Sequence, residues 1–154
     1  MNNKNIWILV IILTALILIS GCFKQPEVDS DAIHNAILKV LKDQTAGWNA
    51  FDIERYMQGY WQSDSLRFAS GDQVQRGWDQ TLERYKRGYP DSKAMGHLTF
   101  SDLDITIISE DAALVFGRFT LEREKDRPTG LFTLLFRKTE DGWRIVHDHT
   151  STAQ

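Results

Sequence analysis

The second half of the chain alternates between apolar and polar residues over four long segments. These segments lie at about residues 96–108, 112–124, 130–138 and 142–151. An alternation with a period of two is typical of β-strands whose two faces meet different surroundings. Short connections rich in turn-forming residues separate them, at residues 109–111, 125–128 and 140–142. Because connections this short join neighbouring antiparallel strands, the second half predicts an antiparallel meander.

The first half predicts helices instead. Residues 30–49 carry apolar side chains at helical spacing, and either Asp29 or Ser30 can cap the start of this helix. Asp52 is expected to cap a second helix. Behind Asp52, apolar and aromatic residues recur three and four positions apart, at Ile53, Tyr56, Met57, Tyr60 and Trp61.

A short strand and a third helix complete the first half. The strand is expected at residues 66–70, and the helix at residues 77–88, where Pro90 ends it. A chain of 154 residues is sized for one globular domain. Helices followed by an antiparallel meander predict an α+β fold, in which the helices pack on one face of a curved sheet.

The N-terminus has the features of a secretion signal. Lys4 is the only charged residue before Lys24, and residues 6–19 are apolar except for Thr14. As a helix this run would span roughly 21 Å, less than the roughly 30 Å hydrocarbon core of a bilayer. It therefore favours a cleaved signal peptide over a membrane-spanning helix, although an uncleaved single-pass anchor is the alternative.

The signal core is followed by Ile19, Ser20, Gly21 and Cys22, which resemble the lipobox of bacterial lipoproteins. The resemblance implies cleavage before Cys22, acylation of its thiol with fatty acids such as palmitate, and attachment to the cell membrane or the outer membrane. Residues 1–21 would then be the signal peptide, residues 22–29 the lipidated cysteine and tether, and residues 30–151 the domain. Under either alternative the domain faces the periplasm or the cell exterior.

Composition limits the other partners. Cys22 is the only cysteine, so no disulfide can form within the chain. The formal charge is −3 and becomes −4 once residues 1–21, which hold one lysine and no acid, are removed. A mildly acidic chain without a basic stripe argues against nucleic acid as a partner.

Three stretches carry a family resemblance, at residues 48–52, at residues 60–64, and from Gly142 through His149 and Ser151. They resemble the nuclear transport factor 2-like superfamily, which includes ketosteroid isomerases and polyketide-cyclase-like proteins. The resemblance is strongest to a branch of unknown function. The resemblance implies that the sheet curls around the helices into a cone with an internal cavity.

The resemblance also gives a reason to disfavour the isomerase mechanism. It implies a carboxylate base near residues 67–70, a tyrosine near Gln44, and an acid within residues 131–137, because that mechanism needs a base and an oxyanion site. None of the three segments offers the required residue.

The last strand predicts the wall of a small-ligand pocket. A period of two places Trp143 and Ile145 on one face with His147, His149 and Ser151, so that this face begins apolar and ends polar. The expected ligand is a small apolar or aromatic molecule, because many aromatic residues fall on inward faces. The candidate ligand-binding residues are His149, His147, Tyr60, Trp61, Ser151 and Trp48.

The sequence supports a metal site or a nucleophilic serine less well than it supports a small-ligand pocket. His147 and His149 would lie about 7 Å apart on one face, a spacing known from paired metal ligands. His97 is available as a third ligand, but the side of the sheet that it occupies remains open, so no metal and no cofactor is expected. Arg118 could counter a ligand carboxylate or lie on the outer face, and its side of the sheet remains open as well. Ser151 lacks a surrounding nucleophile motif.

Three functions follow from these patterns. The first is a lipoprotein that binds a small ligand without catalysis. The second is an enzyme, an isomerase or a hydrolase, with His149 as the candidate catalytic base. The third is a protein-interaction module that forms a homodimer through an outer sheet face with Leu131, Thr133, Leu135 and Val146.

Overall fold

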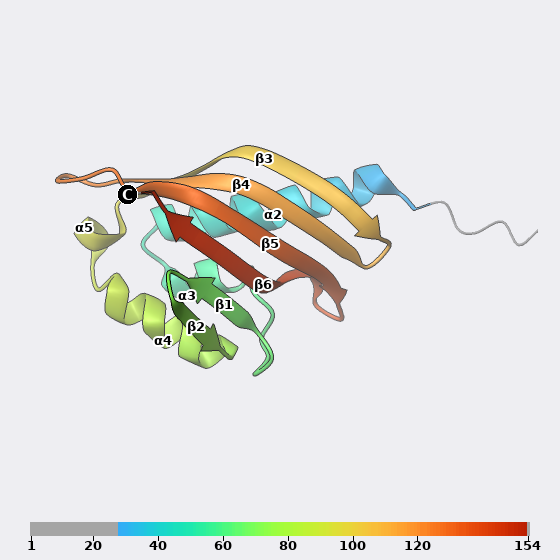
Figure 1. The fold of residues 1–154 in the computed structure, drawn as a ribbon, viewed down its shortest axis with the longest axis horizontal. Coiled ribbons are helices and arrows are strands. Elements are labelled where there is room, and N and C mark those ends of the chain that lie inside the picture. Colours follow the sequence, from blue (N-terminus) through green and yellow to red (C-terminus); the bar gives the residue numbers. More distant parts are fainter. Residues whose placement is uncertain (1–27, 154) are drawn as a thin grey trace, which may run out of the picture.

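The four predicted C-terminal strands are present in the computed structural model, which describes residues 28–153 (Figure 1). They are β3 (His97–Ser109), β4 (Ala112–Glu122), β5 (Thr129–Thr139) and β6 (Gly142–Thr152). Each pairs with the next in antiparallel register. The prediction of an antiparallel meander is therefore confirmed, and its short turns explain the pairing of consecutive strands.

The meander is part of a larger, six-stranded sheet with the order β2-β1-β6-β5-β4-β3. The predicted short strand is β1 (Arg67–Ser70), which forms a hairpin with β2 (Gln73–Arg76). β1 also pairs with β6 in parallel. The sequence did not predict β2, because its four residues are mostly exposed and show no apolar alternation.

The helices follow the predicted caps. α2 (Ser30–Asn49) begins where the Asp29 carboxylate accepts a hydrogen bond from the backbone N–H of Ala32 at 2.9 Å. α3 (Ile53–Met57) begins in the same way behind Asp52. The third predicted helix is α4 (Trp78–Gly88), and a short helix that the sequence did not predict, α5 (Ser92–Met95), follows it.

The second helix is shorter than its apolar stripe suggested. α3 ends at Met57, so the expected continuation through Tyr60 and Trp61 was wrong. The chain instead pairs with β6: the Ile145 N–H donates to the Gly59 carbonyl at 2.9 Å, and the Trp61 N–H donates to the Ile145 carbonyl at 2.9 Å. Pairing with a strand thus overrides the helical pattern at this point.

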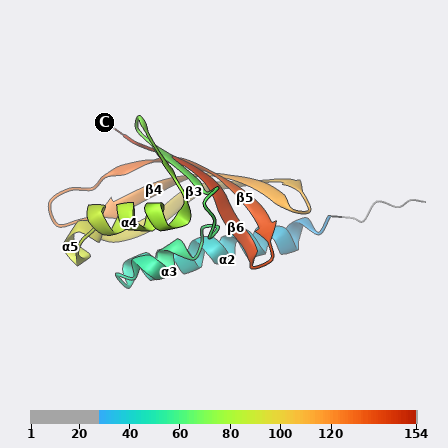
Figure 2. The same cartoon turned by 90° about the horizontal axis from the view of Figure 1, so that it is seen from below.

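All three longer helices lie on the same side of the curled sheet (Figure 2). The core between them includes Ile37 and Leu41 of α2, Met57 of α3, Phe136 of β5 and Ile145 of β6. This arrangement confirms the predicted α+β fold with a curved sheet. Within residues 28–153, no helix is both long and apolar enough to span a bilayer. The expectations for residues 1–27, Cys22 among them, lie outside the described residues.

A bulge in β6 changes which side chains face the helices. Ile145 pairs with Phe136 and His147 pairs with the preceding Leu135, so Val146 has no partner on β5. The other edge of β6 changes partners at the same place, from the Gly59–Trp61 segment to β1, which begins opposite His147. Because the extra residue shifts the alternation by one, Ile145 and Asp148 both point inward.

The predicted side of the two histidines is therefore wrong. His149 is exposed and His147 is half-buried, on the outer side of the sheet. Ser151 is exposed there as well. The expected strict alternation holds as far as Ile145 and fails beyond Val146, because one inserted residue moves every following side chain to the opposite face.

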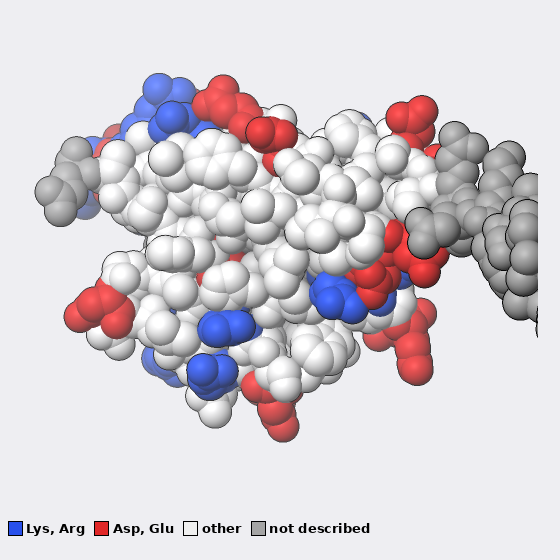
Figure 3. Space-filling view, turned by 45° about the vertical axis from the view of Figure 1, so that its right-hand side comes forward, with Lys and Arg blue, Asp and Glu red and all other residues white. Residues whose placement is uncertain are grey.

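The outer sheet face is partly apolar. Leu114, Phe116 and Leu131 are 37%, 42% and 37% exposed, and Thr133 and Leu135 lie half-buried beside them. The face shown in Figure 3 has a broad uncharged area, with charged side chains above it, below it and to its right. A homodimer through this face stays a prediction.

Candidate functional site

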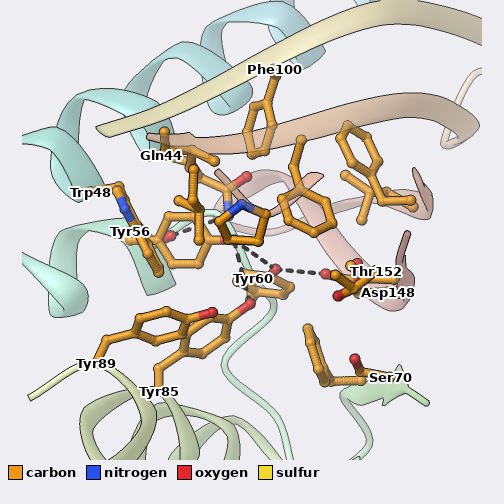
Figure 4. A pocket seen from close by; sticks show the side chains of 18 of the residues that line it. Gln44, Trp48, Tyr56, Tyr60, Ser70, Tyr85, Tyr89, Phe100, Asp148 and Thr152 are labelled. Atoms are coloured by element: carbon orange, nitrogen blue, oxygen red, sulfur yellow. Dashed lines mark hydrogen bonds between the residues drawn. The ribbon is translucent and has the colours of Figure 1, made fainter. Parts of the chain in front are cut away.

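A cavity of about 230 Å³ lies between α4 and the inner face of the curled sheet (Figure 4). Its walls are largely aromatic, with side chains from α2, α3, α4, β3 and β5. They include Trp48, Tyr56, Tyr85, Phe100 and Phe132. Such a cavity, with aromatic walls and a small number of polar groups, is the usual form of a small-ligand site.

Asp148 is the buried acid of this cavity. Its side chain is 3% exposed, and both carboxyl oxygens accept hydrogen bonds. The Tyr60 hydroxyl donates to Oδ2 at 2.7 Å, and the Thr150 hydroxyl donates to Oδ1 at 2.6 Å. Burial raises the pKa of the carboxyl to about 6, against the lowering effect of these hydrogen bonds and of the charge on Arg84. A carboxyl with this pKa can hold or release a proton near neutral pH.

Tyrosine hydroxyls extend inward from this carboxyl (Figure 4). Tyr60 Oη lies 3.3 Å from Tyr56 Oη, which lies 3.4 Å from Tyr85 Oη. These two links are longer than the bond to Asp148, and therefore weaker. Burial and the nearby Asp148 charge raise the pKa of Tyr60 well above its usual value, so its hydroxyl stays protonated.

The direction of these hydrogen bonds follows from the number of protons available. An ionised Asp148 can only accept, so the single Tyr60 proton points to it. Tyr60 Oη can then only accept from Tyr56, which in turn accepts from Tyr85. Protonation of Asp148 removes this constraint, and the charge state of one carboxyl thus sets the orientation of three hydroxyl groups.

Gln44 supplies an acceptor that has no partner. Its side chain is 1% exposed and lines the cavity. The amide Nε2 donates to the Tyr56 carbonyl at 3.2 Å, while Oε1 has no hydrogen-bond partner among residues 28–153. Gly59 makes room for this amide, since a Cβ there would collide with it. A buried acceptor without a partner is costly, and a ligand donor would satisfy it.

Two arginines line the cavity as well, Arg84 from α4 and Arg123 from the end of β4. The Arg84 guanidinium carbon lies 4.6 Å from the centre of the Phe68 ring. Arg84 forms no ion pair within 4.0 Å among the described residues, whereas Arg123 Nε lies 2.8 Å from Asp126 Oδ1. Of the two arginines, Arg84 is therefore the one whose guanidinium N–H groups are available to a ligand.

The structure brings together only part of the predicted site. Trp48 and Tyr60 line the cavity, and Trp61 does not. His147, His149 and Ser151 are absent from the lining, because they follow the bulge. These three side chains lie on the opposite face of the sheet from the cavity.

The two residues whose side was left open also lie away from the cavity. Arg118 pairs with Asp102 at 2.9 Å, and His97 is exposed next to the buried Leu98. Within residues 28–153, no group of three or more His, Cys, Asp or Glu side chains is arranged to hold a metal ion. The polar chemistry of the cavity rests on Asp148, Gln44 and the tyrosines instead.

The sequence reasoning missed the most important residue, Asp148. Strict alternation from Ile145 assigned it to the outer face, whereas the bulge at Val146 turns it inward. Tyr56 and Tyr85 were expected to point inward, but their link to a carboxylate could not be seen without the register of β6. Apolar Ile145 and Val146 in succession are the one local sign that the alternation breaks.

Comparison with family models identifies the family. Residues 37–154 match the SnoaL-like domain. The chain belongs to the SnoaL-like domain family. A comparison with curated proteins gives no match. The family assignment therefore comes without a function transferred from a characterised relative.

Solved structures agree with the SnoaL-like assignment. An NTF-2 like protein of unknown function from Shewanella oneidensis MR-1 is 45% identical, covering 77% of this chain and 98% of its own, with a TM-score of 0.74. A nuclear transport factor 2-like superfamily protein from Salmonella enterica is 23% identical, covers 81% and 94%, and has a TM-score of 0.65.

A ketosteroid isomerase-like protein from Erwinia carotovora atroseptica shares the fold at 18% identity, with coverage of 78% and 95% and a TM-score of 0.62. The resemblance to the nuclear transport factor 2-like superfamily is thus confirmed. At this identity the likeness supports the SnoaL-like fold and says nothing about activity.

Replacing Asp148 with Asn tests the burial of the acid. The folded protein holds the Asp148 proton up to about pH 6, while the unfolded chain releases it near 3.8. Because the folded state binds more protons in this window, ionisation weakens it as the pH rises. The difference in the free energy of unfolding, wild type minus Asp148→Asn, should fall by about 2 kcal/mol from pH 4 to pH 7.

Urea denaturation of the two proteins at matched pH values measures this difference. Carboxylates with lowered pKa values, such as Asp111, change stability in the opposite direction, but they cancel in the comparison. A difference that is constant with pH, or that rises, would contradict the burial of an acid at position 148.

Proposed function

We propose that the protein binds a small, largely aromatic molecule in the cavity of its cone. The observation that carries this proposal is the aromatic-walled space of about 230 Å³ with an unpartnered acceptor on Gln44 and a buried carboxyl on Asp148. Solid packing would have filled this space with side chains. The polar groups lie where they would orient a ligand.

The size of the cavity limits the ligand. A cavity of about 150 Å³ holds one benzene molecule, so a cavity somewhat larger suits a single ring with small substituents. A polycyclic compound would need a larger space. The proposal is therefore for a one-ring ligand.

A substitution that fills the cavity tests ligand binding. Ser70 lines the cavity at the end of β1, and Ser70→Phe would place a ring in the space. Native mass spectrometry of the gently purified full-length protein should show a small molecule bound to the wild type, and at least tenfold less of it on the variant, because the ring occupies its place.

Ala69→Phe is the matched control, since Ala69 pairs with His149 and does not line the cavity. It should retain the small molecule. Equal retention by Ser70→Phe and Ala69→Phe would show that the bound molecule does not occupy the cavity.

The cellular place of this binding domain is proposed from the lipobox-like sequence at Cys22. Acylation of Cys22 would hold the domain at the outer surface of the cell membrane or the outer membrane. The short segment between Cys22 and α2 would keep the cavity close to the lipid surface. Such a position suits a protein that takes up its ligand in the cell envelope.

Replacing Cys22 with Ser tests the anchor. One acyl chain contributes only marginal membrane affinity, and loss of all chains should release the protein to the soluble fraction. Cells labelled with radioactive palmitate should incorporate label into the wild-type protein and not into Cys22→Ser. Label in the variant, or an unlabelled wild type, would contradict the proposal that the protein is a lipoprotein.

Proton transfer at Asp148 is a second candidate function. In place of the exposed His149, the structure offers a buried carboxyl with a pKa of about 6, which suits a general base at neutral pH. Each carboxyl oxygen keeps a lone pair beyond its hydrogen bond to Tyr60 or Thr150. That lone pair could accept a proton from a ligand.

Deuterium exchange into phenylacetone, a one-ring ketone, tests this candidate. Asp148 would take a proton from the carbon next to the carbonyl, leaving an enolate that takes back deuterium from D₂O. Asp148→Asn should slow exchange at least a hundredfold, while Asp102→Asn on the exposed outer side should not. Equal rates for the wild type and Asp148→Asn would rule out the reaction.

A further inference from the structure

We infer that the ligand of this cavity is a one-ring carboxylic acid that also carries a hydroxyl group, with its carboxylate bound by Arg84. This inference rests on the proposed function and adds the chemical class of the ligand. Its basis is the arrangement of one uncommitted cation and one unpartnered acceptor around a single aromatic-walled space.

Arg84 is prepared to bind an anion. Its guanidinium packs over the Phe68 ring at 4.6 Å, which fixes the plane of the group without using its donors. It forms no ion pair among residues 28–153, and it is half-buried at the cavity wall, where water competes less than at the surface. Guanidinium groups bind planar carboxylates through two parallel hydrogen bonds.

The other basic residue of the cavity is less available. Arg123 contacts Asp126 and donates from Nη1 to the Ala94 carbonyl at 3.2 Å. Nη1 is thus used in joining the residue after β4 to α5, and the charge is paired with Asp126, although Nε has no hydrogen-bond partner among residues 28–153. Arg84 alone combines a free fork of donors with a place on the cavity wall.

Acceptors dominate the interior of the cavity. Gln44 reaches it from α2, on the wall opposite α4, and its Oε1 lacks a donor. The Asp148 oxygens accept as well, and Tyr85 Oη keeps acceptor capacity once its proton points to Tyr56. A hydroxyl on the ring would supply the missing donor, so the ligand presents a hydroxyl inward and a carboxylate toward Arg84.

An ammonium group is the competing choice, because Asp148 is an acid. Each Asp148 oxygen keeps a lone pair beyond its bond to Tyr60 or Thr150, but Arg84 adds positive charge to the same space. A ligand cation would be repelled by Arg84 and would leave its donors unused. The charges around the cavity therefore favour an anionic ligand. Binding of an amine would contradict this inference, and the experiment below measures it.

Four one-ring probes separate these possibilities by isothermal titration calorimetry on the full-length protein. They are 4-hydroxyphenylacetate, phenylacetate, 4-methylphenol and tyramine. We expect 4-hydroxyphenylacetate to bind most tightly, at least tenfold better than 4-methylphenol, because a hydrogen-bonded charge contributes more than a neutral contact. Arg84→Gln should remove this advantage and leave the affinity for 4-methylphenol unchanged.

Arg87→Gln is the matched control, since Arg87 is exposed on the same helix and does not line the cavity. It should behave like the wild type with all four probes. Gln44→Met should weaken the hydroxylated probes and spare phenylacetate, because only the hydroxyl is expected to meet Oε1.

The outcomes distinguish this inference from the proposed function. Tighter binding of tyramine, or equal affinity for the acid and 4-methylphenol, overturns the carboxylate inference and leaves ligand binding intact. An equal loss of all probes in Arg84→Gln also overturns it. Absence of binding by every probe, with no molecule retained by the purified protein, overturns both.

Discussion

The structure depends on one inserted residue in its last strand. At Val146, β6 stops pairing with the Gly59–Trp61 segment and starts pairing with β1, while β5 continues along its other edge. The bulge lies where β6 changes its partner. It turns the Asp148 side chain toward the helices and leaves His147 and His149 on the outer face.

The inward turn of Asp148 gives the cavity its chemistry. A carboxyl that is 3% exposed would be strongly destabilising without partners, and the hydroxyls of Tyr60 and Thr150 supply them. The same burial holds its pKa near 6 and ties its charge to the tyrosine hydroxyls beside it. The fold therefore keeps a group that costs stability at neutral pH, which is a common sign of a functional site.

Local patterns predicted the fold well. Interactions between residues close in sequence decide three of the predicted features, and such interactions can be recognised from the sequence. These features are the caps at Asp29 and Asp52, the apolar stripe of α2, and the turns between the four long strands. What failed were features decided by pairing over long distances. α3 ends early because Gly59 and Trp61 pair with Ile145, and β2 is held by its hairpin with β1 and has no apolar face of its own.

In the candidate site, too, features set by local spacing were predicted and features set by strand register were not. Trp48 was expected in the cavity because helical spacing fixes its direction, and it lines the cavity. Tyr60 lines it as well, although α3 ends before this residue and its pairing with β6 places it. The histidines were assigned from alternation alone, and one residue of register reversed them. Arg84 and Gln44 gave no signal in the sequence, since their roles depend on which side chains do not reach them.

The central claim is that residue 148 carries a buried acid facing the cavity. The most direct test is a titration of the aspartate side-chain carboxyl carbons by ¹³C nuclear magnetic resonance, with Asp148→Asn used to assign the signal. We predict a midpoint near pH 6 for Asp148. A midpoint near 4, the ordinary value for an exposed aspartate, would contradict it.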